Sequence, residues 1–398
     1  MTDIRLDRTF WPVGHGAFYT EQFRNAKKNQ IFSAVYDCGA KDEDTVQRCV
    51  DYAVGKGNEI DYVFVSHFHR DHINGLLHLL NYSNIKHIVI PKIEKTRLIE
   101  SYVYNAITAH ENQLEDDAAQ IFIRRQLNFF DMRVAQIIEV APVNEGLLNE
   151  PRRTNIDYLT NIQSGEPIYV PENSTHPYWV YIPVNIDNDV DKRNELIKSL
   201  NKLCDQCYEK HVLDGGQIKW DSISSLLKQK FNDVANAYKT IFKDHNSYSM
   251  PVFSGPTIFA EPMWRLFSCS FLSFMEHKSW SLLRHPRFQM NSSKMLSCLY
   301  MGDFEASVPG LLSKLSQTLG DYYNVVGLQQ VPHHYSPYNH NIELFRERIM
   351  AFGNVNDHKD ISFCHSTYDA IYEETPVPPL VITEENLPQR IRYRMHLQ

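Results

Sequence analysis

The alternation of short apolar runs with helical segments in the first hundred residues restricts the chain to an α/β fold. Nearly every residue is apolar in Tyr62–Val65 and His87–Ile90, as in strands that are buried on both faces. A helical pattern precedes each run, at 44–54 and at 74–80, and the β-rich run Ile31–Tyr36 comes before the first helix. Strands that alternate with helices predict βαβ units and a parallel sheet.

The same alternation returns after a long interruption. Strand-like runs lie at 248–253, 296–301 and 325–331, and helical patterns lie at 308–319 and 341–350. The interrupting residues are polar and helix-favouring at 94–130 and 190–245, so we expect a mostly helical insertion or lid subdomain. The expected division is a first half of the core at 1–93, the insertion at 94–245 and a second half of the core at 246–398.

The composition is that of a globular protein, with 43% hydrophobic and 22% charged residues. A chain of 398 residues can bury a full core without disulfides or structural metals. The formal net charge of −8 excludes a strongly cationic surface for nucleic acid, although it leaves room for a local basic groove.

Several features predict a cytoplasmic protein without a membrane partner. The start, Met1–Arg8, is charged where a signal peptide is apolar, and no run of about 18 apolar residues occurs. The seven cysteines are odd in number and scattered, which fits a reducing compartment. Cys204 and Cys207 form one CxxC pair, which we interpret as two small residues on one helix face rather than as a redox or zinc site.

One segment carries the strongest chemical signal: Ser66-His67-Phe68-His69-Arg70-Asp71-His72, between the strand 62–65 and the helix 74–80. His67 and His69 are two residues apart, so on an extended segment their imidazoles point the same way and suit a zinc-like cation. Asp71 and His72 follow where the chain turns and can face a second cation. Two cations about 3.5–4 Å apart can hold a hydroxide at neutral pH.

Further candidate ligands also follow predicted strands. Asp303 closes the strand 296–301, where a carboxylate can bridge two cations; the alternative is a helix cap. His333 and His334 close the strand 325–331, and one of them would complete the second cation site.

This set of motifs resembles the metallo-β-lactamase superfamily of metal-dependent hydrolases. The resemblance rests on HxHxDH together with Val13-Gly-His-Gly-Ala-Phe18, Val35-Tyr-Asp-Cys-Gly39, Met301-Gly-Asp-Phe-Glu305 and Val331-Pro-His-His-Tyr-Ser336. It is nearest to the branch that contains the hydrolase domain of the bacterial DNA-uptake channel protein. It implies a four-layer αβ/βα sandwich with the large, mostly helical insertion outside it.

The resemblance implies a role for each candidate ligand. His67 and His69 would bind a first divalent ion, Asp71 and His72 a second, and Asp303 would bridge them. His333 would complete the second site, with His334 as its rival, and Asp71 would also handle the proton of the water or leaving group. Many relatives have another first-site histidine, and the candidates for it are His110, His176, His211, His245, His277 and His285. His15 stands where the branch usually has Gln.

The expected function is therefore hydrolysis by a hydroxide held between two divalent ions, zinc first, with manganese or iron as alternatives. The branch favours a phosphodiester or nucleotide substrate, as in a nuclease or cyclic-nucleotide phosphodiesterase. It also suggests a place in bacterial systems of antiviral defence. The alternative is a non-catalytic or regulatory subunit that docks a partner protein through the insertion.

Rings and cations interleave in the segment 255–295, which includes Trp264, Arg265, Trp280 and Arg284. Bases stacking beside a phosphate-binding groove would use such a surface. A flap packed on the core or on a partner would use the same residues, and aromatic stripes are more often structural.

Overall fold

The computed structural model of the chain describes most of the residues before 258 and a smaller part of those after it. The described residues are 2–11, 13–92, 94–111, 123, 134–143, 159–171, 177–207, 210–243, 249–257, 264–272, 279–281, 296–333, 341, 349–352, 380–381 and 389–397.

The first of two main sheets has ten strands among these residues. Its order is β14 (Ser279–Ser281), β13 (Trp264–Leu272), β19 (Gln389–Leu397), β1 (Thr2–Phe10), β2 (Gly16–Asn25), β3 (Gln30–Ala40), β4 (Glu59–Phe64), β5 (Asn84–Pro91), β6 (Val134–Ala141) and β7 (Leu159–Gln163). From β3 to β7 the neighbours are parallel, and from β14 to β3 they are antiparallel. The parallel βαβ region expected from the apolar runs is thus confirmed.

The second sheet has seven strands within the described part of the chain. Its order is β18 (Leu380–Val381), β17 (Ile349–Phe352), β16 (Leu328–Gln330), β15 (Cys298–Tyr300), β12 (Val252–Pro256), β9 (Trp179–Pro183) and β8 (Ile168–Val170). A separate small hairpin joins β10 (Leu213–Asp214) and β11 (Gln217–Ile218).

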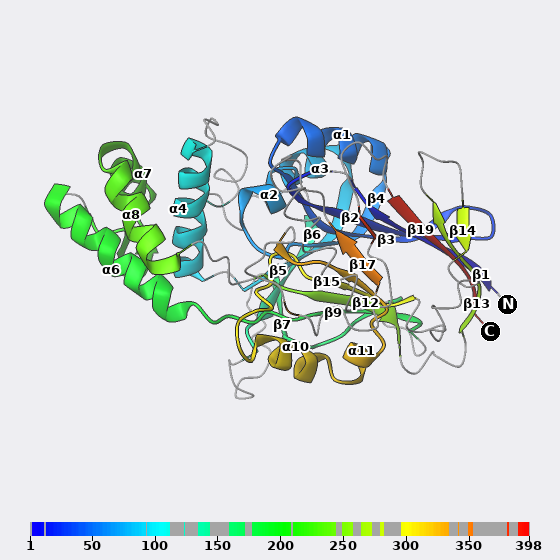
Figure 1. Cartoon of the computed structure of the whole chain (residues 1–398). Helices are drawn as coiled ribbons and strands as arrows, with labels where there is room; N and C mark the ends of the chain where they lie inside the picture. Colours follow the sequence, from blue (N-terminus) through cyan, green and yellow to red (C-terminus); the bar gives the residue numbers. More distant parts are fainter. Residues whose placement is uncertain are drawn as a thin grey trace.

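Helices cover the outer faces of both sheets, so the four-layer αβ/βα sandwich is confirmed (Figure 1). The helices on the first sheet are α1 (Glu43–Ala53), α2 (Arg70–Ile73) and α3 (Leu76–Tyr82). Those on the second sheet are α10 (Leu311–Leu319) and α11 (Asp321–Asn324). A third group stands at one end of the sandwich: α4 (Lys95–Glu111), α6 (Val190–Cys207), α7 (Trp220–Gln229) and α8 (Phe231–Phe242).

Residues 94–245 combine two kinds of structure. Their helices form the group at the end of the sandwich, as a mostly helical insertion requires. Their strands do something else: β6 and β7 continue the first sheet from β5, while β8 and β9 continue the second from β12. Core strands therefore interrupt the helical part, and the division into 1–93, 94–245 and 246–398 stays a prediction.

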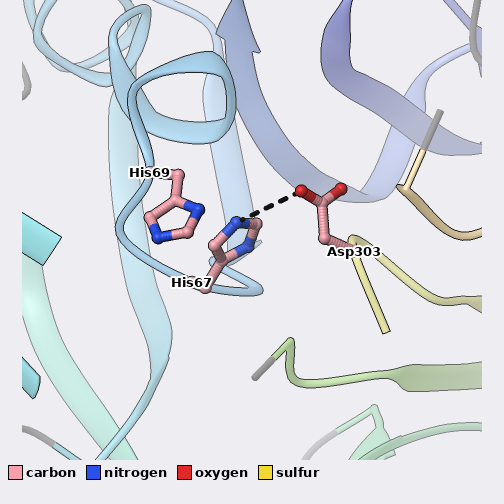
Figure 2. Close-up of side chains that lie close together, drawn as sticks. All are labelled: His67, His69 and Asp303. Carbon is pink, nitrogen blue, oxygen red and sulfur yellow. Dashed lines mark ion pairs between the residues drawn. The ribbon is translucent and has the colours of Figure 1, made fainter. Parts of the chain in front are cut away.

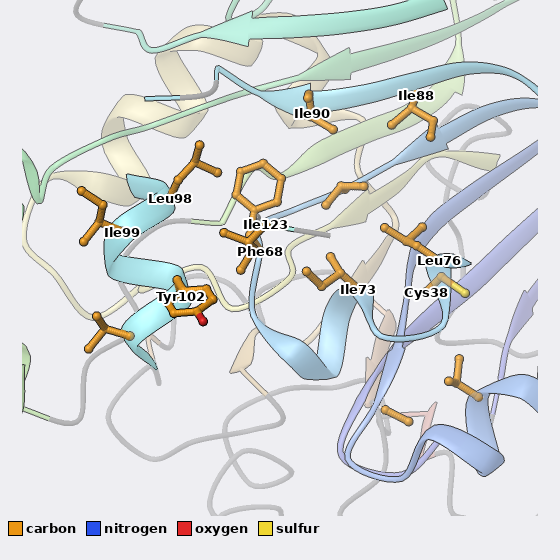
Figure 3. Close-up of a cluster of buried hydrophobic side chains, with 14 of the residues drawn as sticks. Cys38, Phe68, Ile73, Leu76, Ile88, Ile90, Leu98, Ile99, Tyr102 and Ile123 are labelled. Carbon is orange, nitrogen blue, oxygen red and sulfur yellow. The ribbon is translucent and has the colours of Figure 1, made fainter. Parts of the chain in front are cut away.

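The helical group shares one apolar core with the first sheet (Figure 3). Leu98, Ile99 and Tyr102 of α4 belong to the same buried cluster as Phe68 of the histidine segment and Ile88 of β5. Cys204 is buried in this cluster, Cys207 packs against it, and neither forms a disulfide. The CxxC pair thus occupies one face of α6, as expected.

A fully buried carboxylate joins the two sheets. Glu21 of β2 accepts hydrogen bonds from Arg8 Nε at 2.6 Å and from three hydroxyls at 2.7–2.8 Å. The hydroxyls belong to Tyr181 of β9, Ser254 of β12 and Tyr300 of β15, all in the second sheet. Burial and the Glu21 charge raise the pKa of both tyrosines well above the usual value, so their hydroxyls keep the protons that they donate.

Two late predictions of secondary structure need correction. The helix expected at 308–319 begins only at Leu311, because Gly310 before it has a left-handed backbone with φ 83°. The prediction of a helix at 341–350 is wrong for its last two residues, since Ile349 and Met350 lie in β17, which runs parallel to β16. Most of that expected helix, and the side chains of 258–295, lie outside the described residues.

No helix in the described ranges is long and apolar enough to cross a membrane.

Candidate metal centre

The histidine segment lies at the carboxyl end of β4, and its first half is extended. Val65 N still pairs with Val89 O at 2.9 Å, and His69 (φ −77°, ψ 151°) immediately precedes α2. His67 and His69 therefore project before the chain turns, whereas Asp71 and His72 lie inside the first turn of α2. From the second sheet, Asp303 follows the end of β15 and His333 follows the end of β16.

These strand ends bring the predicted ligands together. His67 Nε2 lies 3.6 Å from one carboxylate oxygen of Asp303, and His72 Nε2 lies 3.1 Å from the other. Figure 2 shows the rings of His67 and His69 beside Asp303. Two groups of three could each hold a metal ion, His67–His69–Asp303 and Asp71–His72–Asp303, with ligand atoms within 4.8 Å of one another. Asp303 belongs to both, as a bridging carboxylate would.

His333 lies next to these groups without belonging to either. Its Nε2 is 4.0 Å from Asp303 Oδ2, and its backbone N donates to Gly302 O at 2.9 Å. Its backbone has φ 50°, an uncommon value for a residue with a Cβ. His334 lies outside the described residues, so the choice between the two stays a prediction.

Two of the six candidates for an additional first-site histidine are engaged elsewhere. His110 stacks on Phe231 with ring centroids 3.9 Å apart, and His211 Nε2 lies 3.0 Å from Asp205. The side chains of His176, His245, His277 and His285 lie outside the described residues.

Asp37 orients the second group, a role that the sequence analysis did not assign. It lies just before the end of β3 and accepts from Ser66 N at 2.7 Å, from Ser66 Oγ at 2.7 Å and from His72 Nδ1 at 2.8 Å. A proton on His72 Nδ1 leaves Nε2 to face Asp303. A carboxylate behind a histidine in this way is a common support for metal ligands. The Asp-Cys-Gly motif that follows the predicted strand 31–36, and that lies within β3, is the signal that could have identified it.

The His67 ring is also oriented by hydrogen bonds at its Nδ1 atom. Because Ser66 Oγ donates its proton to Asp37, it accepts one from His67 Nδ1 at 2.8 Å, and Ser249 Oγ is 3.2 Å from the same nitrogen. The remaining nitrogen, His67 Nε2, is buried and has no hydrogen-bond partner within the described part of the chain. A buried nitrogen lone pair beside a carboxylate fits a bound cation, so the residues present suit a divalent metal.

The pKa shifts follow from burial and from the neighbouring charges. Burial, with His72 and His69 nearby, holds the pKa of His67 well below its usual value, which favours the neutral form. Burial would also lower the pKa of His72, but Asp303, Asp71 and Asp37 together raise it well above the usual value. Burial raises the pKa of Asp37 despite the opposing effect of His72 and Ser66.

Helix α4 supports the histidine segment from behind, which the sequence analysis also missed. Asn105 accepts from Arg70 N at 2.9 Å and donates to Phe68 O at 2.9 Å. The Tyr104 ring stacks on His69 with centroids 3.9 Å apart. Glu100 is fully buried, with Oε1 4.0 Å from His69 Nε2.

Asp71 and His15 lie at the more exposed side of the site. The Asp71 side chain is 18% exposed and its Oδ2 lies 3.8 Å from His72 Nε2. His15 is 46% exposed, with Nε2 3.5 Å from the same oxygen. Solvent or a substrate can therefore reach Asp71 more readily than the fully buried His72.

The comparison with protein families agrees with this geometry. A family model described as the metallo-beta-lactamase superfamily matches residues 32–119, which contain the Asp-Cys-Gly motif, the histidine segment and α4. No match was found among the curated proteins. The match supports the expected resemblance to this superfamily, whose members are typically metal-dependent hydrolases. The narrower branch, that of the DNA-uptake channel protein, stays a prediction.

Proposed function

We propose that the chain is a metal-dependent hydrolase of phosphodiesters, of the nuclease or cyclic-nucleotide type. The observation that carries the proposal is the meeting of two groups of three ligating side chains on one shared carboxylate, Asp303. A structural metal site needs one closed group of ligands, whereas paired groups with a shared carboxylate suit hydrolysis.

In this proposal His67 and His69 hold the first ion, Asp71 and His72 the second, and Asp303 contacts both. His333, whose side chain is partly exposed beside Asp303, completes the second position. Divalent ions bound there, zinc first and manganese or iron as alternatives, would supply a hydroxide nucleophile at neutral pH and stabilise negative charge on phosphoryl oxygens.

The chain's own residues orient the ligands and handle protons. Asp37 and Ser66 direct Nε2 of His72 and His67 toward Asp303. Asp71 is the catalytic residue of the proposal: its Oδ2, on the exposed side, would hold the proton taken from water and pass it to the leaving oxygen. His15, 3.5 Å away, would contact the same oxygen or a substrate oxygen.

The choice of phosphodiesters rests on the order of motifs along the chain, which resembles the DNA-uptake branch. A role in antiviral defence and a cytoplasmic location are proposals on the same ground. The regulatory-subunit alternative remains the competing hypothesis, because a helical group at the end of the sandwich offers a surface to a partner.

Metal analysis and a substrate panel test the proposal. The wild-type protein should carry about two ions per chain and hydrolyse a generic phosphodiester, cyclic dinucleotides or single-stranded nucleic acid in Zn²⁺, Mn²⁺ or Fe²⁺. Asp71→Asn should lower the rate by at least about 10²-fold, because it removes a ligand of the second ion together with the proton-transfer group. Asp303→Ala should lose both ions.

Asp51→Asn is the matched control, because Asp51 is an exposed residue of α1 that pairs with His78. It should keep the wild-type ion content and rate. A protein that binds two ions but turns over no phosphodiester in any of these metals would contradict the proposal and favour the regulatory subunit.

A further inference from the structure

A buried chain of polar side chains extends from the helical group to His69. Tyr238 of α8 donates its hydroxyl to Glu100 Oε1 at 2.5 Å, and the same oxygen lies 4.0 Å from His69 Nε2. Tyr238, Glu100 and His69 are all buried. These side chains thus connect α8 and α4, two helices of residues 94–245, to His69, a ligand of the first metal position.

The orientation of the His69 ring indicates what this row of polar side chains does. Nε2 is the nitrogen that faces Glu100, so Nδ1 is the nitrogen left for the group with His67 and Asp303. In Figure 2 one ring nitrogen of His69 lies on the side toward His67 and the other lies away from it. A proton on Nε2 and a lone pair on Nδ1 are what a ligand in this orientation requires.

We propose that Glu100, held by Tyr238, is a positioning residue that directs Nδ1 of His69 to the first metal ion. The inference rests on the metal site of the proposed function, but not on its substrate. Carboxylates behind ligating histidines fix the ring and raise its basicity, and their loss typically weakens metal binding about 10–100-fold. The 4.0 Å separation exceeds a hydrogen bond, and such contacts often tighten only in the loaded state.

The surroundings of His69 support this role. Glu100 and Tyr104 are four residues apart on α4 and therefore lie on the same face of the helix. Tyr104 stacks on the His69 ring at a 23° interplanar angle, so it restricts the tilt of the ring while Glu100 faces one of its nitrogens. Asn105 holds the backbone on both sides of His69 through Phe68 O and Arg70 N. Residues 100–105 of α4 thus hold both the ring and the backbone of this ligand.

Titration of metal-free protein with Co²⁺ tests the proposal, because visible absorption reports the ligand arrangement without any turnover. The first position is isolated in an Asp71→Asn background. There, Glu100→Gln should weaken Co²⁺ binding about 10–100-fold and change the absorption band. Tyr238→Phe should weaken it about threefold, because it removes one hydrogen bond to the carboxylate.

Two controls separate positioning from a general effect on folding. Tyr102→Phe removes a hydroxyl on the same helix that contacts Ser224 at 3.2 Å, away from the site, and should leave the affinity unchanged. In a His69→Ala background Glu100 has no ring to direct, so Glu100→Gln should alter Co²⁺ binding less than about twofold.

A Glu100→Gln protein that binds Co²⁺ at the first position within about twofold of its parent overturns the proposal. So does an equal loss of affinity in the His69→Ala background. If Glu100→Gln fails to fold, Tyr238→Phe decides, and an unchanged affinity there overturns it. A protein that passes these tests but hydrolyses no phosphodiester contradicts only the proposed function.

Discussion

At the scale of single residues, the site depends on close contacts at two glycines, where a Cβ would collide with the histidine segment or its neighbours. A Cβ on Gly39 would lie 2.4–2.5 Å from the backbone atoms of Asp71 and His72. A Cβ on Gly302 would lie 2.8 Å from Ser66 and Ser249, and Gly302 also has φ 54°. Both glycines thus let strand ends approach the histidine segment closely enough for their neighbours, Asp37 and Asp303, to reach it.

Gly39→Ala should therefore displace the backbone at Asp71 and His72. Overpacking of this kind costs about 1–3 kcal/mol, and here the contacts are with backbone that cannot rotate away. We expect a lower free energy of unfolding in urea and weaker binding of the second ion, measured by chelator competition.

Gly57→Ala is the control, because Gly57 has φ 78° but open space around it. It should cost about 1–2 kcal/mol of backbone strain and leave ion binding unchanged. Equal ion affinities in Gly39→Ala and wild type would show that the close contact does not position the second group.

The candidate ligands could be predicted from the sequence where their spacing itself indicates metal binding. His67, His69, Asp71 and His72 are close in the chain, and Asp303 follows a recognisable strand, so their meeting could be predicted. Glu100 could not be, because a glutamate in a polar helix usually faces solvent. Only packing of α4 against the histidine segment shows that it is buried.

At the scale of elements, α4 is a structural part of the site. The Asn105 amide bonds Phe68 O and Arg70 N, so it holds the chain on both sides of His69. Phe68 itself lies in the apolar cluster with Leu98 and Tyr102 of the same helix (Figure 3). The helix and the segment are therefore joined by polar and apolar contacts.

Asn105→Ala should loosen this junction. It removes two buried hydrogen bonds, and the expected loss is about 1–3 kcal/mol of unfolding free energy, read from urea denaturation. The first ion should bind more weakly as well, since His69 lies between the two bonded backbone groups.

Asn201→Ala is the matched variant, because Asn201 also accepts from a backbone amide, Val212 N at 2.8 Å, but lies away from the site. It should lower stability without a change in ion affinity. If both variants lose ion affinity equally, the effect belongs to general stability and not to the α4 junction.

Elements with strong periodic signals were predicted well, and the rest depended on tertiary partners. The buried strands β4 and β5 follow from their apolar runs. In contrast, β1 and β2 carry buried charges, Arg8 and Glu21, whose burial is explained only by their pairing across the fold. The first two residues of β17, Ile349 and Met350, were expected to end a helix, because the pairing of this strand with β16 is not visible in local sequence.

At the scale of the whole molecule, the carboxylate of Glu21 links the two sheets through four donors. Glu21→Gln should leave the buried Arg8 charge poorly compensated and replace an acceptor oxygen by a donor. Removing one partner of a buried ion pair costs about 3–5 kcal/mol. We expect a large decrease of the urea midpoint.

Glu59→Gln is the comparison, since Glu59 pairs with Lys86 at 2.6 Å on the surface. An exposed pair of this kind contributes at most about 1 kcal/mol. A Glu21→Gln variant as stable as Glu59→Gln would contradict the assignment of Glu21 as the polar link between the sheets.

The alternating regions predicted an α/β fold, and the sandwich itself was expected from the resemblance of the motifs to the metallo-β-lactamase superfamily. Inside 94–245 the run Trp179–Pro183 is strand-like in sequence and forms β9, whereas β6, β7 and β8 were not predicted, since the stretch around β7 and β8 is rich in turn residues. Their place becomes clear only from their neighbours, β5 and β12, in the two sheets.

The distance along the chain between His67 and Asp303 also bears on biosynthesis. During translation the histidines emerge long before β15 and the residue that follows it, so a nascent chain holds an incomplete set of ligands. In the proposed site, stable capture of ions is therefore expected only after Asp303 has joined the histidines. Metal loading would then be a late step of maturation.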